Sequence, residues 1–346
     1  MIHIDGSIGG GQMLRSAISL SALTGKGVRI TEIRKGKENA KPGLRPQHMK
    51  VIETIGSFCN AEILGLKENS LEIDFRPWQL SVKDRKIDIG TAGSVSLLVQ
   101  SVLPLMFFSN KENILTIKGG TDVSWSPSIN YLKYVFLPML RKMGAIAELE
   151  ILNHGFYPKG GGEVKLRATP VKQIKPISAI ERGGLIGIHL ESVVGKYPKE
   201  YAERQAKSAL GVFEYELPKE KISVSLKAAN TEDFGSSMLL YALFENSIIG
   251  VDAISERGFE PEKFGLRIAE DFVSMLKKDF AADKFLADQL LLYMALAKGK
   301  SQIKVEQITE HCLTNIHVIE KFLPVNFEID KVNKIISVEG ANFSKE

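Results

Sequence analysis

The sequence predicts an α+β protein, an α/β sandwich in which three units of the order βαβαββ form one large domain. Strand-like and helix-like segments follow this order over residues 2–75 and again over residues 85–168. The stretches 97–108 and 290–296 are apolar on all sides of a helix, so they must be buried between other layers rather than lie on a surface. Repetition and all-round apolar helices together predict a layered fold.

The third unit is predicted to be interrupted. It begins at residue 177, breaks off, and resumes near residue 282. The intervening chain has its own alternation of strands and helices, which is typical of a small α/β domain. We therefore expect a large domain from residues 1–183 and 280–346, with the smaller domain, residues 184–279, inserted into the third unit.

Composition describes an ordinary globular protein. The 346 residues are 44% hydrophobic and carry a net charge of only +4, so binding to a nucleic acid would need a local basic patch. No apolar run approaches membrane-spanning length and no secretory signal is evident, which favours a cytoplasmic protein without membrane contact. Cys59 and Cys312 lie far apart, which argues against a disulfide framework or a thiolate zinc site.

The first unit opens with a strand at residues 2–5. A glycine run follows, and then a helix over residues 13–23 that Gly25 closes. The unit continues with a strand, a second helix and two strands, at residues 28–33, 46–60, 61–66 and 70–75. The glycine run before the helix could hold a phosphate at the helix N-terminus, but a tight strand-to-helix turn explains it equally well.

The second and third units repeat this order. The second is predicted to comprise strand 85–89, helix 91–108, strand 114–118, helix 128–143 and strands 146–151 and 163–168. The third is predicted to comprise strand 177–180, helix 284–298, strand 301–305, helix 311–322 and strands 326–330 and 334–338. Asp283 is a candidate N-cap for the first of these two helices, and Gly299 a candidate left-handed residue at its C-terminus.

The inserted domain is predicted from the same kinds of pattern. Its elements are strand 186–193, helix 198–213, strand 222–226, an extended pair within 238–253 and helix 261–276. Residues 230–237 have the composition of a loop, and the sequence assigns no function to them.

Two stretches could bind a nucleotide or an RNA backbone. Phe285, Asp288 and Gln289 share one helix face near its start, where a ring, a carboxylate and an amide could read a purine; ordinary first-turn residues look the same. A Pro- and Gly-broken loop carries the basic residues Arg34, Lys35, Lys37, Lys41, Arg45 and His48. This cluster could bind the phosphates of a polyanion. A solvated surface loop without a ligand would have the same composition and explains the cluster equally well.

Residues 154–164 read HGFYPKGGGEV and join the last two strands of the second unit. The three glycines would let a ligand approach the backbone closely, although a hairpin turn also explains them. This segment resembles the signature of the RNA 3'-terminal phosphate cyclase family. Further matches cover nearly the whole chain: Asp5-Gly6, Gly9-Gly10-Gly11-Gln12, Leu14-Arg15, Ala40-Lys41-Pro42-Gly43-Leu44, Ala92-Gly93-Ser94, Gln100, Val102-Leu103-Pro104, Gly119-Gly120-Thr121, Leu286-Ala287-Asp288-Gln289, His311 and Thr314-Asn315.

The resemblance implies a ligase that uses ATP, with a divalent cation such as Mg or Mn, to convert an RNA 3'-phosphate into a 2',3'-cyclic phosphate. His311 matches the histidine that attacks the α-phosphate and carries AMP. The residues that match nucleotide contacts are Gln100, Pro127, Phe285, Leu286, Ala287, Asp288 and Gln289. The residues that the resemblance assigns to contacts with the RNA or its phosphates are Gln12, Arg15, Lys41 and Arg45. The partners are ATP and an RNA with a 3'-phosphate end, and the resemblance leaves homo-oligomer formation open.

Local physics agrees with the role of His311. A ring at a helix N-terminus lies in the positive end of the dipole, which disfavours the imidazolium and keeps the imidazole neutral and nucleophilic. Two departures from the family pattern stand out. Ile8 replaces a glutamate that is thought to hold the metal, so the metal ligands stay unassigned, and Phe285 replaces a common tyrosine.

Two other functions are compatible with parts of this pattern. A cyclase-like ribosome-assembly factor would bind partners without catalysis, but such proteins lack the nucleophilic histidine that His311 matches. An enolpyruvyl-transferase-like enzyme shares repeated βαβαββ units, but it would not need His311 or the HGFYPKGGGEV segment. The cyclase is therefore the favoured hypothesis.

Overall fold

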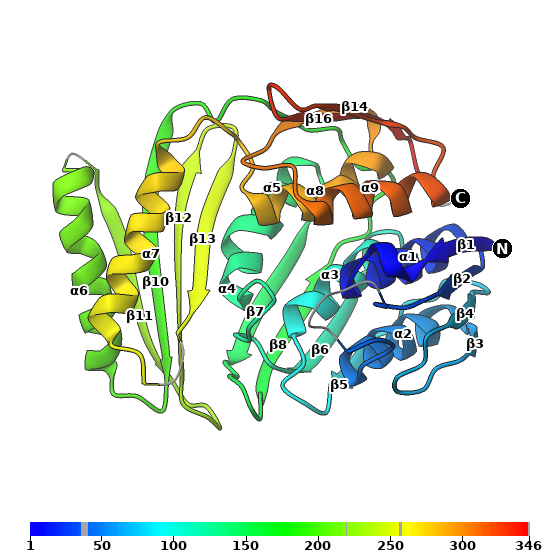
Figure 1. The fold of residues 1–346 in the computed structure, drawn as a ribbon, viewed down its shortest axis with the longest axis horizontal. Coiled ribbons are helices and arrows are strands. Elements are labelled where there is room, and N and C mark those ends of the chain that lie inside the picture. Colours follow the sequence, from blue (N-terminus) through cyan, green and yellow to red (C-terminus); the bar gives the residue numbers. More distant parts are fainter. Residues whose placement is uncertain (36–40, 219, 256–257, 345–346) are drawn as a thin grey trace.

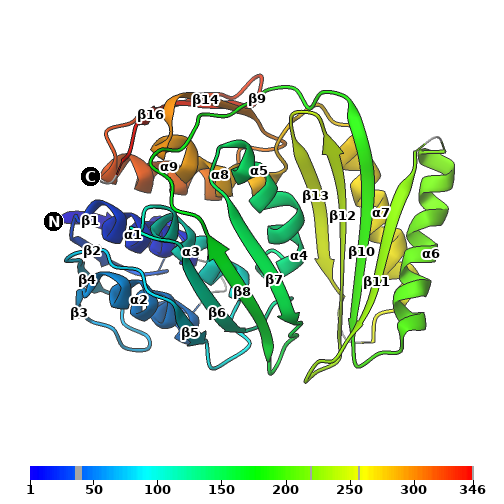
Figure 2. The same ribbon diagram turned by 180° about the vertical axis from the view of Figure 1, so that it is seen from behind.

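The computed structural model describes residues 1–35, 41–218, 220–255 and 258–344. Helices and mixed sheets alternate along the chain, and the predicted α+β class is confirmed. Figure 1 shows a broad body on the right, which holds both termini, and a sheet with two long helices on the left. Figure 2 shows the same arrangement from behind.

Three four-stranded sheets share one strand order. The first contains, in spatial order, β1 (Ile2–Asp5), β2 (Val28–Thr31), β4 (Ile73–Arg76) and β3 (Glu62–Leu64). The second contains β5 (Arg85–Asp88), β6 (Asn113–Gly119), β8 (Gly162–Ala168) and β7 (Ala147–Asn153). The third contains β9 (Ser178–Ala179), β14 (Lys298–Lys304), β16 (Ile335–Ala341) and β15 (Phe327–Asp330). In each sheet the first pair is parallel and the next two pairs are antiparallel.

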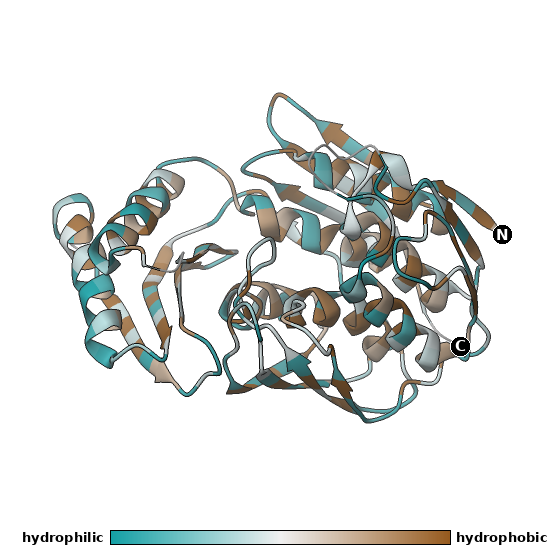
Figure 3. Ribbon diagram, turned by 60° about the horizontal axis from the view of Figure 1, so that its bottom comes forward, coloured by the Kyte–Doolittle hydropathy of each residue, from teal (hydrophilic) through white to brown (hydrophobic). Residues whose placement is uncertain are grey.

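A fourth sheet lies between β9 and β14 in the sequence. Its strands, in spatial order, are β11 (Ile222–Ala229), β10 (Leu185–Gly195), β12 (Gly235–Phe244) and β13 (Ile248–Ile254). Helices α6 (Lys199–Glu216) and α7 (Pro261–Leu276) cover one face and form a separate apolar core with it. Much of α6 is hydrophilic (Figure 3), as expected for a helix on the outside. The domain boundaries at 184 and 279 stay a prediction.

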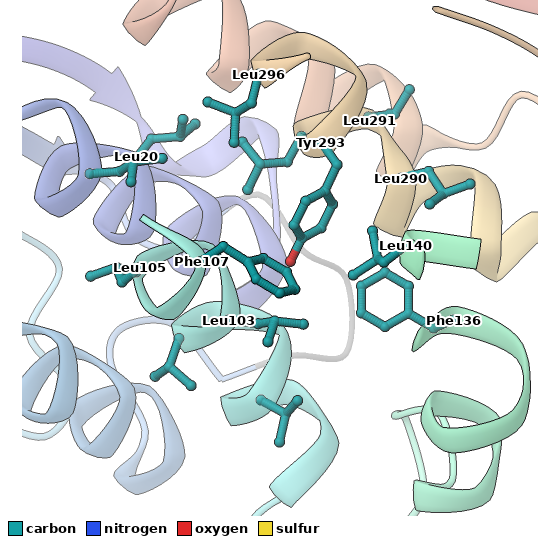
Figure 4. Close-up of a cluster of buried hydrophobic side chains, with 14 of the residues drawn as sticks. Leu20, Leu103, Leu105, Phe107, Phe136, Leu140, Leu290, Leu291, Tyr293 and Leu296 are labelled. Atoms are coloured by element: carbon teal, nitrogen blue, oxygen red, sulfur yellow. The ribbon is translucent and has the colours of Figure 1, made fainter. Parts of the chain in front are cut away.

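The remaining helices supply the main core. They include α1 (Gly11–Thr24), α2 (Pro46–Cys59), α3 (Val95–Phe107), α5 (Leu137–Lys142), α8 (Lys284–Leu296) and α9 (Glu310–Phe322). A 3₁₀ turn, η1 (Gly6–Ile8), precedes α1. Every residue from Leu290 to Leu296 is buried, as the apolar sequence predicts. Figure 4 shows leucines of α1, α3, α5 and α8 around Tyr293.

Some predicted elements differ in detail. The predicted helix 128–143 is divided into α4 (Ile129–Tyr131), one turn of π-helix, η2 (Leu132–Phe136), and α5 (Leu137–Lys142). Gly299 does have a positive φ of 107°, but it lies within β14, because α8 ends at Leu296 and Ala297 is already extended. The predicted cap of α8 is confirmed, since Asp283 accepts hydrogen bonds from the amides of Phe285 and Leu286.

Candidate active site

The first turn of α9 presents His311. Thr309 caps this helix by accepting a hydrogen bond of 3.1 Å from the Cys312 amide, so the helix begins at Glu310, one residue before the predicted start. Cys312 is buried, whereas His311 is exposed. Asn315 follows His311 by four residues and therefore lies on the same face of α9. That face turns toward α8.

Asp288 joins three helices. Its carboxylate accepts a hydrogen bond from Gln12 Nε2 of α1 and one of 3.3 Å from Asn315 Nδ2 of α9, which also donates to the Asp288 carbonyl at 3.1 Å. Burial raises the pKa of Asp288 to about 6, against the opposing effects of Gln12, Arg15 and Asn315. The structure thus brings Gln12 and Arg15, predicted to bind RNA or phosphate, next to Asp288 and Gln289, predicted to bind the nucleotide.

A cavity lies between these helices. It is lined by Gln12, Arg15, Ser16, Ser19, Gln100, Ser101, Phe136, Asp288, Gln289, Leu292, Tyr293 and Asn315. Within the described chain, four of these residues have a buried polar atom without a hydrogen-bond partner: Gln100 Nε2, Gln289 Oε1, Tyr293 Oη and Asn315 Oδ1. Leaving such atoms unpaired is costly, so their concentration here indicates a cavity built for a polar ligand.

The residues predicted to flank the base lie outside this cavity lining. Phe285 is 41% exposed, and its ring meets Tyr131 edge to face with 6.2 Å between centroids. The Pro127 carbonyl accepts a hydrogen bond of 2.7 Å from Ser96, just before α4. Tyr131, the last residue of α4, also donates to Asp283 at 2.7 Å, which fixes α4 against the start of α8.

Leu286 and Ala287 are each 0% exposed. Their side chains belong to the core, so a nucleotide could contact only the backbone of these two residues. The family match at these positions therefore has a structural explanation in packing, independent of any ligand.

The glycine run lies beside α9. A methyl group added at Gly9 would lie 2.8 Å from Thr314 Cγ2, so only glycine allows this approach of the run to the helix that carries His311. A methyl group at Gly11 would lie 2.5 Å from His48 Nε2. The N-terminus of α1 thus faces both α9 and the start of α2, where a phosphate could use its free amides.

Part of the predicted basic loop forms a cluster around His48. Its Nδ1 accepts a hydrogen bond of 3.2 Å from the Arg45 amide, so the neutral ring carries its proton on Nε2. Burial, together with the charges of Arg15, Arg34 and Arg45, lowers the pKa of His48 to about 3. Asp288 lies near Arg15, and Glu68 Oε1 lies 3.8 Å from Arg45 Nη1, so these two carboxylates offset part of the charge of the three arginines.

The other residues of that loop contribute less. Lys41 is exposed, and Arg45 Nη1 donates to Asn69 Oδ1 at 2.7 Å. Lys37, like Ala40 of the family match, lies outside the described residues.

The HGFYPKGGGEV segment has a structural role. His154 is 2% exposed and its Nδ1 lies 2.9 Å from Asp122 Oδ2, which also accepts a hydrogen bond of 2.7 Å from Thr121. A methyl group at Gly155 would lie 2.2 Å from the Gly162 amide, and one at Gly161 would meet the Glu232 carboxylate at 2.6 Å. These glycines therefore permit close approach of protein atoms, and the alternative of ligand contact is not needed.

The same segment contacts the fourth sheet. The Lys159 amide donates to Asp233 at 2.8 Å, and methyl groups at Gly195 and Gly235 would lie 2.8 Å and 2.1 Å from the Phe156 ring. Residues 230–237, predicted as a loop without an assigned function, therefore pack against the family signature, and the last three of them already belong to β12.

Ligands for a metal are not apparent in the described chain, where no three His, Cys, Asp or Glu side chains form a suitable group. Ile8, at the position of the family's glutamate, is 47% exposed. A protein-held metal therefore does not fit the residues present. Among the described residues, no helix is both long enough and apolar enough to cross a membrane.

Comparison with known proteins assigns the family. The family model described as RNA 3'-terminal phosphate cyclase matches residues 7–329. The chain belongs to this family. Relatives named RNA 3'-terminal phosphate cyclase include the proteins of Pyrobaculum aerophilum, 38% identical with 99% of each chain covered, and Methanosarcina barkeri, 39% identical with 98% of this chain and 99% of the relative covered. The Pyrococcus furiosus protein is 39% identical with 95% of each chain covered.

Several residues that line the cavity were not predicted as site residues. Asn315 could have been found, because it lies four residues after His311. Tyr293 could not, since it stands in an apolar run that gives no polar periodicity. Phe136 was hidden in the same way within the predicted helix 128–143.

Proposed function

We propose that the chain is an ATP-dependent RNA 3'-phosphate cyclase and that His311 is its nucleophile. The observation that carries this proposal is the position of His311. The residue lies in the first turn of α9, on the face where Asn315 lines the cavity, and one turn before Thr314, which contacts the glycine run. A histidine, a polar cavity and a helix start that carries a glycine run therefore lie on neighbouring helices, which supports the proposal.

The cavity suits adenine. Gln100 Nε2 is a donor and Gln289 Oε1 an acceptor, and both are buried without a partner in the described chain. Adenine carries an amino donor beside ring nitrogens that accept, so two glutamine amides can satisfy its polar edge. Phe285 and Pro127, at the starts of α8 and α4, would then contact the faces of the ring system or the ribose.

The chemistry follows from this placement. A ring nitrogen of His311 attacks the α-phosphorus, forming a nitrogen–phosphorus bond as the bond to the β-phosphate breaks and pyrophosphate leaves. An oxygen of the RNA 3'-phosphate then takes the adenylyl group and restores the histidine. The 2'-hydroxyl attacks the activated phosphorus, loses its proton and expels AMP, which closes the ring.

The arginines near the start of α1 supply charge stabilisation. Arg15, with a pKa lowered to about 10 by burial, and Arg34 and Arg45, around His48, can neutralise negative charge that develops on the phosphates. A divalent cation, when bound, would add to this neutralisation. Since the described residues offer no suitable ligand group, we assign no side chain to it.

ATP labelled in the α-phosphate tests the proposal. Wild-type protein should retain acid-labile label, and adding an RNA with a 3'-phosphate should release the label as AMP while the RNA end becomes cyclic. His311→Asn should fold and bind ATP but retain no label, because asparagine offers no comparable nucleophile.

The variant His317→Asn serves as the control, because His317 is a second exposed histidine of the same helix, six residues beyond His311. It should label as the wild type does. Wild-type labelling of His311→Asn would refute the assignment. A wild-type protein without label would instead favour a non-catalytic, partner-binding role.

A further inference from the structure

Trp125 is 100% exposed, the most exposed aromatic residue of the described chain. It lies in the segment between β6 and α4, two residues before Pro127. A large aromatic side chain that packs on nothing in its own chain gains no stability from burial. The whole ring is therefore open to contact with a ligand.

The backbone of Trp125 is also unusual. Its φ is 66°, in the left-handed region that bulky residues rarely adopt. Such a conformation persists where the surroundings enforce it, often at a ligand site. Hydrogen bonds fix the segment on both sides, since Ser126 Oγ donates to the Val123 carbonyl at 2.9 Å and the Ser128 amide donates to Asp252 at 2.5 Å.

The segment is joined to the candidate active site. The Pro127 carbonyl is held by Ser96, and α4 follows at once and brings Tyr131 against Phe285 and Asp283. On its other side, Asp122 pairs with Phe156, and the next residue, Tyr157, is 75% exposed. Trp125 and Tyr157 are therefore two exposed aromatic residues on segments that pair with each other near the candidate nucleotide site.

We propose that Trp125 is a stacking platform for a base near the 3' end of the RNA. This inference rests on the proposed function, in which the RNA 3'-phosphate must reach the adenylyl group on His311, so the terminal nucleosides must lie close to the nucleotide site. Aromatic rings bind single-stranded nucleic acids through base stacking, which tolerates any sequence. An enzyme that acts on RNA ends needs that tolerance.

Fluorescence tests the inference directly, because the chain has only two tryptophans. In Trp78→Phe, Trp125 is the single tryptophan. A short single-stranded RNA with a 3'-phosphate should quench its emission, and ATP alone should not. Quenching by ATP alone would overturn the inference in favour of a nucleotide contact. An emission change that depends on protein concentration without RNA would overturn it in favour of contact with a second copy.

Kinetics provide the second readout. Trp125→Ala should raise the KM for RNA between about 5-fold and 150-fold, as expected for loss of one base-aromatic stack, and label retention from ATP should be unchanged. Trp125→Gly relaxes the left-handed backbone and should show the same rise, while Trp125→Tyr should show a small one.

These variants separate the possible failures. If Trp125→Ala labels normally and its KM for RNA equals that of the wild type, the platform is refuted. A rise in Trp125→Ala that is absent in Trp125→Gly would show loop distortion and also refute it. If the wild-type protein takes no label from ATP, the proposed function itself is refuted, and the stacking inference, which rests on it, is refuted with it.

Discussion

Burial determines the electrostatics of individual residues in this protein. Asp288 and Asp252 both have a pKa raised to about 6 because their carboxylates are removed from water, and each is held by hydrogen bonds from other elements. His48 shows the reverse effect, since burial and neighbouring arginines keep its ring neutral. The candidate active site thus combines groups whose charges are set by the fold rather than by their identity.

A prediction at this scale concerns Phe285. Its ring meets Tyr131 edge to face, the Lys284 ammonium lies 5.0 Å from its centroid, and the residue is 41% exposed, so part of the ring is open to a ligand. If it stacks on the base of ATP, Phe285→Ala should raise the ATP concentration needed for half-maximal labelling, by an amount that corresponds to about 1–3 kcal/mol. Phe285→Tyr should be mild. Equal ATP dependence in wild type and Phe285→Ala would show that the ring serves packing alone.

A second prediction concerns Asp252. Its raised pKa is caused mainly by burial and also by Asp283 and Asp122 nearby. The folded protein therefore holds a proton that the unfolded chain releases near pH 4, so this contribution to stability is present below that pH and is lost as the pH rises through about 6. Asp252→Asn should remove this loss while its amide oxygen still accepts the Ser128 amide.

Chemical unfolding at pH 4 and pH 7 measures the effect. Relative to wild type, Asp252→Asn should gain up to about 3 kcal/mol on going from the lower to the higher pH. Asp84→Asn is the control, because Asp84 also accepts a backbone amide but is exposed. A change in Asp252→Asn no larger than in Asp84→Asn would contradict the prediction.

At the scale of elements, helix starts organise the candidate site. The N-termini of α1, α4, α8 and α9 carry the glycine run, Pro127, Phe285 and His311, respectively. Side-chain caps fix three of these starts: Ser128 for α4, Asp283 for α8 and Thr309 for α9. The start of α1 has no side-chain cap, so its first-turn amides are the ones best suited to a phosphate.

The cap of α9 gives the prediction for this scale. Thr309→Ala removes the bond to the Cys312 amide, and loss of such a cap costs about 1 kcal/mol. Because the first turn then frays, the rate of label transfer to His311 should fall more than the affinity for ATP. Thr309→Ser keeps the oxygen and should resemble wild type. A stability loss in Thr309→Ala without any loss of labelling rate would show that the cap does not position His311.

Sequence patterns predicted elements better than contacts between them. The extents of most strands and helices agree with the structure because periodicity and caps are local signals, as with Asp283 and Gly25. The π-turn after Tyr131 has no such signal and was missed. The links from Asp288 to Gln12 and Asn315 join residues up to 276 positions apart, so only the fold could reveal them.

For the whole molecule, the HGFYPKGGGEV segment connects the second sheet to the fourth. Phe156 is 2% exposed and its ring lies against Gly195 and Gly235, at the ends of β10 and β12. Two hydrogen bonds also join β13 of the fourth sheet to the starts of α4 and α8. The Ser128 amide donates to Asp252 of β13, and the Gly250 amide of β13 donates to Asp283. Leu239, Tyr241 and Ile248 of this sheet also belong to the main core, where Tyr241 stacks on Tyr134 with 5.5 Å between ring centroids. The fourth sheet is therefore held to the large body by polar contacts, by an apolar interface and by the buried Phe156 ring.

The contribution of the Phe156 contact to the free energy of unfolding can be measured with substitutions at Gly235 and Phe156. An added methyl group would lie 2.1 Å from Phe156 Cγ, so Gly235→Ala should destabilise the protein by about 1–3 kcal/mol through overpacking. Phe156→Ala should cost about 3–5 kcal/mol because it removes a buried ring. In Phe156→Ala, however, the two closest atoms, Cγ and Cδ1, are absent, and only Cβ remains at 2.6 Å from the added methyl group. The double variant should therefore lose less stability than the sum of the two single changes, with a coupling of about 0.5–3 kcal/mol.

Gly211 provides the matched control for this cycle. It lies inside α6 with no atom within 4 Å of an added methyl group, so Gly211→Ala should stabilise the protein by about 0.5–1 kcal/mol and should be additive with Phe156→Ala. If the signature segment holds the fourth sheet in place, Phe156→Ala should also lower the rate of cyclisation, because α4 and Pro127 depend on Asp252 of that sheet. Additive losses in the Gly235 and Phe156 cycle, with normal cyclisation, would mean that the signature segment stabilises only its own hairpin. The fourth sheet would then be placed by its other contacts, among them Asp252, Asp283 and the stack of Tyr241 on Tyr134.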